Sequence, residues 1–266
     1  MKLSILIPAY NERYTIAQVV AAVTRVLPDV TKEIVIVDDC SNDGTGDFLR
    51  ARLGDRTGVY SAVETDGVDT LEPVAISGDD KALITFKVLF HEVNRGKGGA
   101  LQTAMKAATG DVIVIQDADL EYDPADWERM YHLIATRKVA DVVYGSRFFG
   151  LPHRSLFYHH YLANRLISSL FNMLYNQTIS DVEVCYKMMT RDVLQSLRLS
   201  CDDFGIELEI SAQIALWRKW RIYETAVAYY GRTYAEGKKI NWRDGIKALW
   251  YLFKFRVQYR GFGKAA

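Results

Sequence analysis

The sequence has few cysteines and no long apolar run. Cys40, Cys185 and Cys201 are an odd number of cysteines without Cys-x-x-Cys spacing, which argues against a disulfide framework or a zinc cluster and fits a reducing compartment. No window approaches the roughly 20 apolar residues that a membrane-spanning helix needs. Pro8 interrupts the first apolar run, so we expect no secretory leader. The sequence therefore predicts a cytosolic protein without membrane spans.

Neither sign of charge is in excess. Lysine plus arginine and aspartate plus glutamate both number 33, so the overall basic excess typical of nucleic-acid binding is missing, and we expect no nucleic-acid partner. Any charged ligand must bind at a local patch. The 266 residues are 49% hydrophobic and 25% charged, which is enough for the core of one large α/β domain.

Two common nucleotide-binding motifs are also missing. No Gly-x-Gly-x-x-Gly follows the first apolar run, which argues against a dinucleotide-binding fold. The stretch Arg95-Gly96-Lys97-Gly98 lacks the spacing of a Walker loop. It is either a phosphate-binding loop or the glycine-rich start of a helix, which we expect at about residues 100–108.

Apolar runs that end in polar loops and lead into helices predict a parallel sheet whose loops open on one edge. The first two such units comprise residues 3–27 and 33–53. Between 54 and 81 the periodicity is lost, and this segment is either a β-excursion or a functional loop. We expect strands at 3–7, 33–37, 83–90, 112–115, 139–144 and 220–227, and a loop that leads into a strand at 181–187.

The central feature is the apolar run 112–115, which ends in a cluster of carboxylates that includes Asp117, Asp119 and Glu121. Open α/β sheets bind ligands at the carboxyl ends of their strands. Acidic side chains so close together repel each other unless a cation or hydrogen-bond donors hold them. Mg²⁺ and Mn²⁺ bind carboxylates and leave positions for phosphate oxygens, so this stretch predicts a metal-diphosphate platform.

Cationic residues follow later strands. Arg147 lies just after the predicted strand at 139–144, and its guanidinium suits bidentate contact with phosphate oxygens. Arg165 and Ser169 share one face of a long helix at 157–175, whose apolar face we expect to carry Leu162, Leu166, Leu170 and Leu174. The loop at 230–239 gathers Arg232, Lys238 and Lys239. His153, His159 and His160 lack a regular ligand spacing, so we expect surface or packing roles for them.

The tail at 242–260 mixes aromatic and basic residues, among them Trp250, Phe253 and Lys254. This composition suits the headgroup layer of an anionic membrane. A helix docked on the domain or on a second subunit explains it equally well.

Five ordered motifs resemble those of the GT-A, family 2 inverting glycosyltransferases, and more narrowly the dolichol- and polyprenyl-phosphate mannose synthases. The resemblance covers most of residues 1–235 and implies a GT-A domain there, with 54–81 as an irregular insertion and 236–266 as an amphipathic tail. The motifs are Pro8-Ala9-Tyr10-Asn11-Glu12, Val37-Asp38-Asp39-Cys40-Ser41, Asn94-Arg95-Gly96-Lys97-Gly98, Asp117-Ala118-Asp119 and Gly145-Ser146-Arg147.

The resemblance also implies roles for individual residues. Asp117 and Asp119 would ligate Mg²⁺ or Mn²⁺, joined by Glu121, where the mannose synthases usually have glutamine. Arg147, Arg165 and Ser169 would hold the acceptor phosphate, and Asp117, Asp119 and Arg147 are the expected catalytic set. The nucleotide sugar would be held by Pro8, Tyr10, Glu12, Val37, Asp39, Lys97, Asp117, Ala118, Arg232 and Lys238.

These roles imply the transfer of a hexose, with mannose from GDP-mannose expected first and UDP-glucose or a UDP-N-acetylhexosamine as alternatives. The acceptor would be a polyprenyl phosphate at the cytosolic membrane face, which the tail would contact, with a homodimer or a membrane-protein partner as further options. A phosphate is already largely ionised at neutral pH and needs no general base. A saccharide or protein hydroxyl would need one, either Asp181 or Glu183. A scaffold that binds nucleotide sugar without turnover is the third hypothesis.

Overall fold

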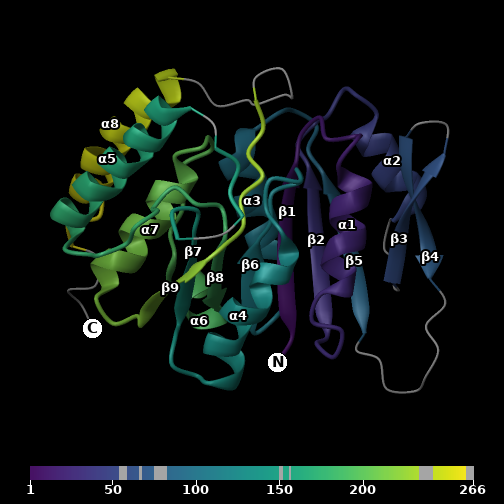
Figure 1. The fold of residues 1–266 in the computed structure, drawn as a ribbon, viewed down its shortest axis with the longest axis horizontal. Helices are drawn as coiled ribbons and strands as arrows, with labels where there is room; N and C mark the ends of the chain where they lie inside the picture. The colour runs from purple at the N-terminus through teal and green to yellow at the C-terminus, as the bar shows by residue number, and fades with distance from the viewer. Residues whose placement is uncertain are drawn as a thin grey trace.

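The computed structural model describes residues 1–53, 59–65, 68–74, 83–149, 152–155, 157–233 and 242–261. Within these ranges a seven-stranded sheet has the order β5-β2-β1-β6-β8-β7-β9, and β3 and β4 form a separate antiparallel hairpin (Figure 1). The strands are β1 Leu3–Ala9, β2 Lys32–Asp38, β3 Val59–Thr65, β4 Val68–Val74, β5 Ile84–Phe90, β6 Val112–Ile115, β7 Val142–Ser146, β8 Lys187–Thr190 and β9 Ile222–Ala226.

Helices connect and cover these strands, and they lie largely where the sequence predicted them. They are α1 Ile16–Arg25, α2 Thr45–Arg52, α3 Gly96–Ala107, α4 Trp127–Tyr131, α5 Tyr158–Tyr175, α6 Arg191–Ser196, α7 Ile206–Trp217 and α8 Trp242–Gln258, with a 3₁₀ turn Pro124–Asp126 before α4 and a π turn His132–Thr136 after it.

The centre of the sheet is parallel, as predicted. β1 pairs with β2 and β6 in register, so that Leu3 lies beside Lys32 on one side and Val112 on the other. All residues of β2, β6 and β7 are buried, because helices and loops cover both faces of the sheet and apolar runs suit that environment. The carboxyl ends of these strands therefore meet at one edge.

One strand reverses the pattern. β8 is antiparallel to both β6 and β7 and lies between them. Its first residue, Lys187, pairs with Tyr144, close to the carboxyl end of β7. The chain from Asp181 to Lys187 therefore enters the sheet at the same edge where the acidic cluster leaves β6. This placement of residues 181–187 could not be derived from their sequence pattern.

Three local predictions needed correction or a choice. α3 begins at Gly96 rather than near residue 100, so Arg95-Gly96-Lys97-Gly98 is the start of a helix. Gly98 N donates to Asp202 O at 2.8 Å, and a Cβ at Gly98 would lie 2.1 Å from Cys201 O, so only glycine fits there.

Residues 59–65 and 68–74 form the β3–β4 hairpin, which is the β-excursion alternative.

The predicted apolar face of α5 was wrong in part. Leu162 and Leu166 are about half exposed, whereas Ile167, Phe171 and Tyr175 face the core. α5 lies beside α8 at the sheet end that is farthest from the hairpin (Figure 1). Because leucine side chains also occur on exposed faces, the four-residue leucine spacing alone did not identify the core-facing side.

α8 is docked on the domain through its apolar side. Its buried residues pack against α5 and α7, and Tyr175 OH donates to the carbonyl of Leu252 at 2.8 Å. The buried set is Ala248, Leu252, Phe255 and Tyr259. No helix in the described part of the chain is long and apolar enough to cross a membrane.

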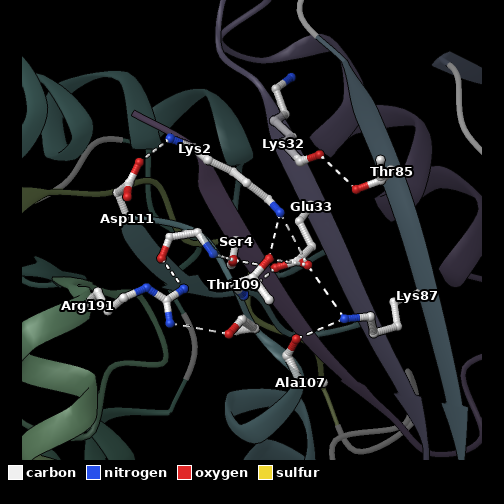
Figure 2. Close-up of polar contacts among 12 residues, drawn as sticks. Lys2, Ser4, Lys32, Glu33, Thr85, Lys87, Ala107, Thr109, Asp111 and Arg191 are labelled. Carbon is white, nitrogen blue, oxygen red and sulfur yellow. Dashed lines mark hydrogen bonds and ion pairs between the residues drawn. The ribbon is translucent and has the colours of Figure 1, made fainter.

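A polar network closes the edge of the sheet at which β1 and β2 begin (Figure 2). Glu33 is buried there and accepts hydrogen bonds from Ser4 Oγ at 2.7 Å, Thr109 N at 2.7 Å and Thr109 Oγ1 at 2.8 Å. Lys2 and Lys87 lie 3.4 Å and 3.6 Å from the same carboxylate. These contacts fix β1, β2, β5 and the start of β6 together, away from the predicted site.

Candidate functional site

The acidic cluster follows β6 and meets a cation from α3. Lys97 Nζ lies 2.7 Å from Asp117 Oδ1 and 3.1 Å from a carboxylate oxygen of Glu207 on α7. Burial by itself would lower the pKa of Lys97, but the facing carboxylates raise it well above its usual value. Burial would likewise raise the pKa of Asp117, and Lys97 outweighs that effect and lowers it. Lys97 and Asp117 therefore form a charged pair.

Asp119 and Glu121 are held by the loop that follows β9. Arg232 Nη2 donates to Asp119 Oδ2 at 2.8 Å, and Arg232 N donates to Glu121 Oε1 at 2.8 Å. Tyr229 OH donates to Glu121 Oε2 at 2.9 Å. Burial and the charges of Asp117 and Glu121 raise the pKa of Asp119 to about 7, although Arg232 opposes this. The three carboxylates are thus close enough to repel one another.

The donor set suits a hard divalent ion. Asp117 and Asp119 offer the carboxylate oxygens that Mg²⁺ and Mn²⁺ prefer, and a cation between them would relieve the repulsion that raises the pKa of Asp119. Glu121 directs both oxygens toward the loop at 229–232. Within the described residues, no group of three His, Cys, Asp or Glu side chains is arranged to hold a metal ion. The three-residue ligand set stays a prediction.

The predicted nucleoside residues gather at the ends of β1 and β2. Pro8 pairs with Val37 in the parallel register, and Tyr10, 38% exposed, follows β1. Asp39 accepts hydrogen bonds from Gly96 N at 2.8 Å and Arg95 N at 2.9 Å, and it lies 2.6 Å from His91 Nδ1. Its carboxylate therefore fixes the start of α3.

Glu12 lies between the nucleoside side and the acidic cluster. Its carboxylate accepts from Thr15 Oγ1 at 2.8 Å and lies 3.6 Å from Arg232 Nη1. Thr15 Oγ1 also lies 2.9 Å from the carbonyl of Ala118. Lys238, predicted to bind the donor diphosphate, falls outside the described residues.

Arg147 is already paired. Its Nε and Nη2 atoms donate to the two carboxylate oxygens of Asp181 at 2.7 Å each, and its backbone N donates to the same group at 3.1 Å. Asp181 has no exposed surface. No residue in the described segments bonds to Nη1 of Arg147, so this donor is open to a ligand. Asp181 is consequently committed to Arg147 and is a poor candidate for a general base.

Arg165 and Ser169 line a cavity of about 300 Å³ between α5 and the chain that leads to Asp181. Phe149, Asn172, Thr178 and Ser180 are among the other lining residues. The guanidinium of Arg165 lies 5.3 Å from the ring centre of Phe148 and has no hydrogen bond or ion pair to any residue that the structure describes. The cavity therefore carries a positive charge that the described protein does not neutralise.

The sequence matches the family described as Glycosyl transferase family 2 over residues 4–61 and 79–198. The chain belongs to glycosyl transferase family 2. Among its family 2 relatives, a dolichol-phosphate mannosyltransferase of Pyrococcus furiosus is 28% identical over 148 residues, which is 56% of this chain and 34% of that protein. An undecaprenyl-phosphate mannosyltransferase of Micrococcus luteus is 23% identical over 249 residues, which is 90% of this chain and 87% of that protein.

Solved structures show the same fold. Glucosyl-3-phosphoglycerate synthase of Mycobacterium tuberculosis, in complex with Mn²⁺, uridine diphosphate and glucosyl-3-phosphoglycerate, superposes with a TM-score of 0.64 at 17% identity. The likeness covers 96% of this chain and 79% of that one. The predicted α/β, GT-A type fold is thus confirmed, and the family 2 match includes the acidic cluster, Lys97, Arg147 and Arg165.

This family 2 site contains residues that sequence reasoning missed. Glu207 on α7 lies between Lys97 and Lys187, and its second oxygen pairs with Lys187 Nζ. Tyr229 contacts Glu121, and its ring lies 5.4 Å from the guanidinium of Arg147. The only signal for Glu207 was a carboxylate within a mostly apolar helix that also carries Glu209, which by itself indicates a buried partner but not its identity.

Proposed function

We propose that this protein transfers a hexose, with mannose as the first expectation, from a nucleotide diphosphate sugar to a polyprenyl phosphate, with inversion at the anomeric carbon. The observation that carries the proposal is Arg165 in its cavity, whose guanidinium has no hydrogen bond or ion pair within the described ranges, at the same edge of the sheet as the acidic cluster. The names of the Pyrococcus and Micrococcus relatives support a lipid phosphate acceptor.

The donor half needs charge neutralisation, because a nucleotide diphosphate leaves poorly until its negative charge is balanced. Asp117 and Asp119 would hold the divalent ion, which supplies part of that balance. Lys97 and Arg232 lie against the same two carboxylates and provide hydrogen-bond donors for diphosphate oxygens. Lys238 would add a further charge from the same loop as Arg232.

The acceptor half needs a cationic pocket and no base. Arg165 and Ser169 offer donors to an acceptor phosphate inside the cavity. Nη1 of Arg147 remains for the same phosphate, since Asp181 fixes the rest of that guanidinium. A phosphate with its second pKa at about 6 is largely a dianion at neutral pH and attacks without deprotonation.

A hydroxyl acceptor is the second candidate, and one observation favours it. Burial raises the pKa of Glu183 to about 7, with Asp181 and Glu207 adding to the shift and Arg147 and Lys187 opposing it. A carboxyl group that titrates near neutrality suits general-base catalysis. Because Asp181 is paired with Arg147, Glu183 is the remaining base from the two predicted.

Contact with a membrane surface completes the proposal. Trp250, Phe253 and Val257 of α8 are each more than half exposed, and Lys254 Nζ lies 4.9 Å from the ring centre of Trp250. α5 adds the exposed Tyr158 and Leu162. Aromatic and basic residues together suit an anionic headgroup layer. A lipid acceptor at the cytosolic membrane face would meet the protein there.

Transfer to a defined acceptor tests the function. Purified protein is incubated with Mn²⁺ or Mg²⁺, a panel of radiolabelled nucleotide sugars and a short polyprenyl phosphate. We expect lipid-linked product from the wild type, none from Asp119→Ala, and a wild-type yield from Asp29→Asn, a control at an exposed carboxylate. Transfer only to an added saccharide would reject the phosphate acceptor in favour of a hydroxyl. Donor binding without any turnover would indicate the scaffold.

A further inference from the structure

Residues 181–187 connect the acceptor half of the site to the donor half. Asp181 binds Arg147 on the acceptor side. Lys187 pairs with Glu207, which lies 3.1 Å from Lys97 on the donor side. The apolar residues between them, Val182, Val184 and Tyr186, have no exposed surface. The polar side chains of this segment therefore serve the site while the apolar ones anchor it in the core.

Glu183 is the acidic residue of this segment for which the described part of the chain supplies no partner. Its carboxyl group makes no hydrogen bond or ion pair with any residue in the described ranges. Its charged surroundings come from both halves of the site, namely Arg147 and Asp181 from the acceptor side and Lys187 and Glu207 from the donor side. The side chain is partly buried, and a partly buried carboxyl group without a donor is costly to keep charged, so a ligand that supplies donors would stabilise it.

The chemistry of the substrate indicates which part can meet Glu183. The leaving diphosphate and the acceptor phosphate are anions without donors, and they would repel a carboxylate. The nucleoside is expected near Pro8 and Val37, on β1 and β2, whereas Glu183 precedes β8 on the other side of β6. The sugar lies between the diphosphate and the acceptor, and it is the part rich in hydroxyl donors.

We infer that Glu183 is a specificity-determining residue that accepts hydrogen bonds from hydroxyl groups of the transferred sugar. The inference rests on the donor half of the proposed function. It explains why a carboxyl group at the junction of the two halves is kept without a partner among the residues that the structure describes. It also implies that the protein distinguishes a nucleotide sugar from the bare nucleotide diphosphate through this residue.

Calorimetric titration tests the inference without an acceptor. In the presence of MnCl₂, wild type and Glu183→Ala are titrated with GDP-mannose, UDP-glucose, GDP and UDP. We expect Glu183→Ala to weaken binding of the preferred nucleotide sugar by about tenfold or more, the worth of one or two hydrogen bonds to a charged group. Binding of the matching nucleotide diphosphate should change less than twofold. Glu128→Ala, at an exposed glutamate, is the matched control.

Three outcomes would overturn the inference. Equal weakening of nucleotide-sugar and nucleotide-diphosphate binding would mean that Glu183 acts only through the charge balance of the site. Unchanged binding of both ligands would mean that Glu183 does not contact the donor substrate. Glu183 would instead be a general base if three results came together. The Ala variant would bind both ligands as the wild type does, it would lose transfer to a saccharide hydroxyl, and the wild-type rate would rise with pH through about 7. Glu183→Gln, which keeps the size of the side chain, replaces Glu183→Ala if the latter unfolds. If the wild type does not transfer sugar to polyprenyl phosphate, the proposed acceptor is wrong, but the comparison of nucleotide-sugar and nucleotide-diphosphate binding still tests the role of Glu183.

Discussion

Arg147 and Arg165 differ in how far the protein already uses their charge. Arg147 is fixed by two hydrogen bonds to the buried Asp181. Arg165 is exposed and contacts the ring of Phe148 without a carboxylate partner among the described residues. A fixed arginine orients a ligand, whereas an unpaired one contributes most of the binding charge. We therefore expect the two substitutions to have different consequences.

Replacing Arg165 should impair the acceptor half alone. We expect Arg165→Ala to raise the KM for a short polyprenyl phosphate by about 10-fold to 100-fold, because a hydrogen bond to a charged group contributes about 1.5–3 kcal/mol. The KM for the nucleotide sugar and the melting temperature should stay near those of the wild type. Steady-state kinetics measures both constants. Arg137→Ala, another exposed arginine, is the control, and an equal effect there would refute the specific role.

Replacing Asp181 should destabilise the fold. Asp181→Leu leaves the 16% exposed side chain of Arg147 without its counter-charge, and breaking a buried pair from one side costs about 3–5 kcal/mol. Denaturant unfolding should show this loss as a lower midpoint. The double variant Arg147→Met/Asp181→Leu should recover part of the stability, because no unpaired charge remains. A double variant as unstable as the sum of the two single ones would contradict the pairing.

At the scale of elements, the two edges of the sheet perform different tasks. The edge where β1 and β2 begin is closed by hydrogen bonds to Glu33 (Figure 2). The opposite edge gathers carboxylates and cations, and there burial, together with the charges of Asp117 and Glu121, raises the pKa of Asp119 to about 7. The contacts of Glu33 thus stabilise one edge, and the opposite edge carries the candidate site, which is where open α/β sheets bind ligands.

Acid should weaken the Glu33 edge. Burial alone would raise the pKa of Glu33, but hydrogen bonds from Thr109 and Ser4 and the charge of Lys2 lower it from 4.5 to about 2. Between those values the unfolded chain binds more protons than the folded chain. The contribution of Glu33 to the free energy of unfolding is therefore complete above pH 4.5 and is lost as the pH falls toward 2. With a discount for solvent screening, we expect it to be about 1–2 kcal/mol.

The Glu33→Gln variant isolates this contribution. Its free energy of unfolding should be lower than that of the wild type at pH 7, and the difference should shrink as the pH falls from about 4.5 to 2. Urea unfolding at a series of pH values measures both curves. A difference that stays constant over this window would show that the charge of Glu33 is not responsible.

At the scale of the whole molecule, α5 and α8 lie at one end of the sheet (Figure 1). Both helices carry exposed apolar side chains. α8 uses Leu252 and Phe255 to dock on the domain, while Trp250 and Phe253 point outward. The sequence left membrane contact and docking as alternatives for this tail. The described helix accommodates both, because its opposite faces are apolar.

Replacing outward residues should separate membrane binding from folding. We expect Trp250→Ala/Phe253→Ala to bind vesicles with anionic lipid at least several-fold more weakly than the wild type, with little loss of stability. Leu252→Ala should instead cost about 2–5 kcal/mol of folding free energy, because Leu252 is buried. Vesicle co-sedimentation and thermal unfolding measure the two effects. Vesicle binding that is unaffected by the outward substitutions would reject this face as the contact surface.

The sequence by itself determined the parallel centre of the sheet and the edge that carries the site. Apolar runs such as 112–115 have the length and continuity of buried strands, and the acids that follow them must lie at the carboxyl edge. The helix at 157–175, on which Arg165 and Ser169 lie one turn apart, was also predicted correctly in extent, since local periodicity encodes it.

Only the tertiary structure decided which residues form ion pairs with the charged side chains of the candidate site. The antiparallel insertion of β8 brings Asp181 to Arg147, and the packing of α7 brings Glu207 to Lys97. It also turned Leu162 and Leu166 toward the surface. Such contacts join residues far apart in the chain, and neither spacing nor propensity encodes which distant side chain will supply a counter-charge. The local pattern thus fixes where the chemistry gathers, and long-range packing fixes which charges remain available to a ligand.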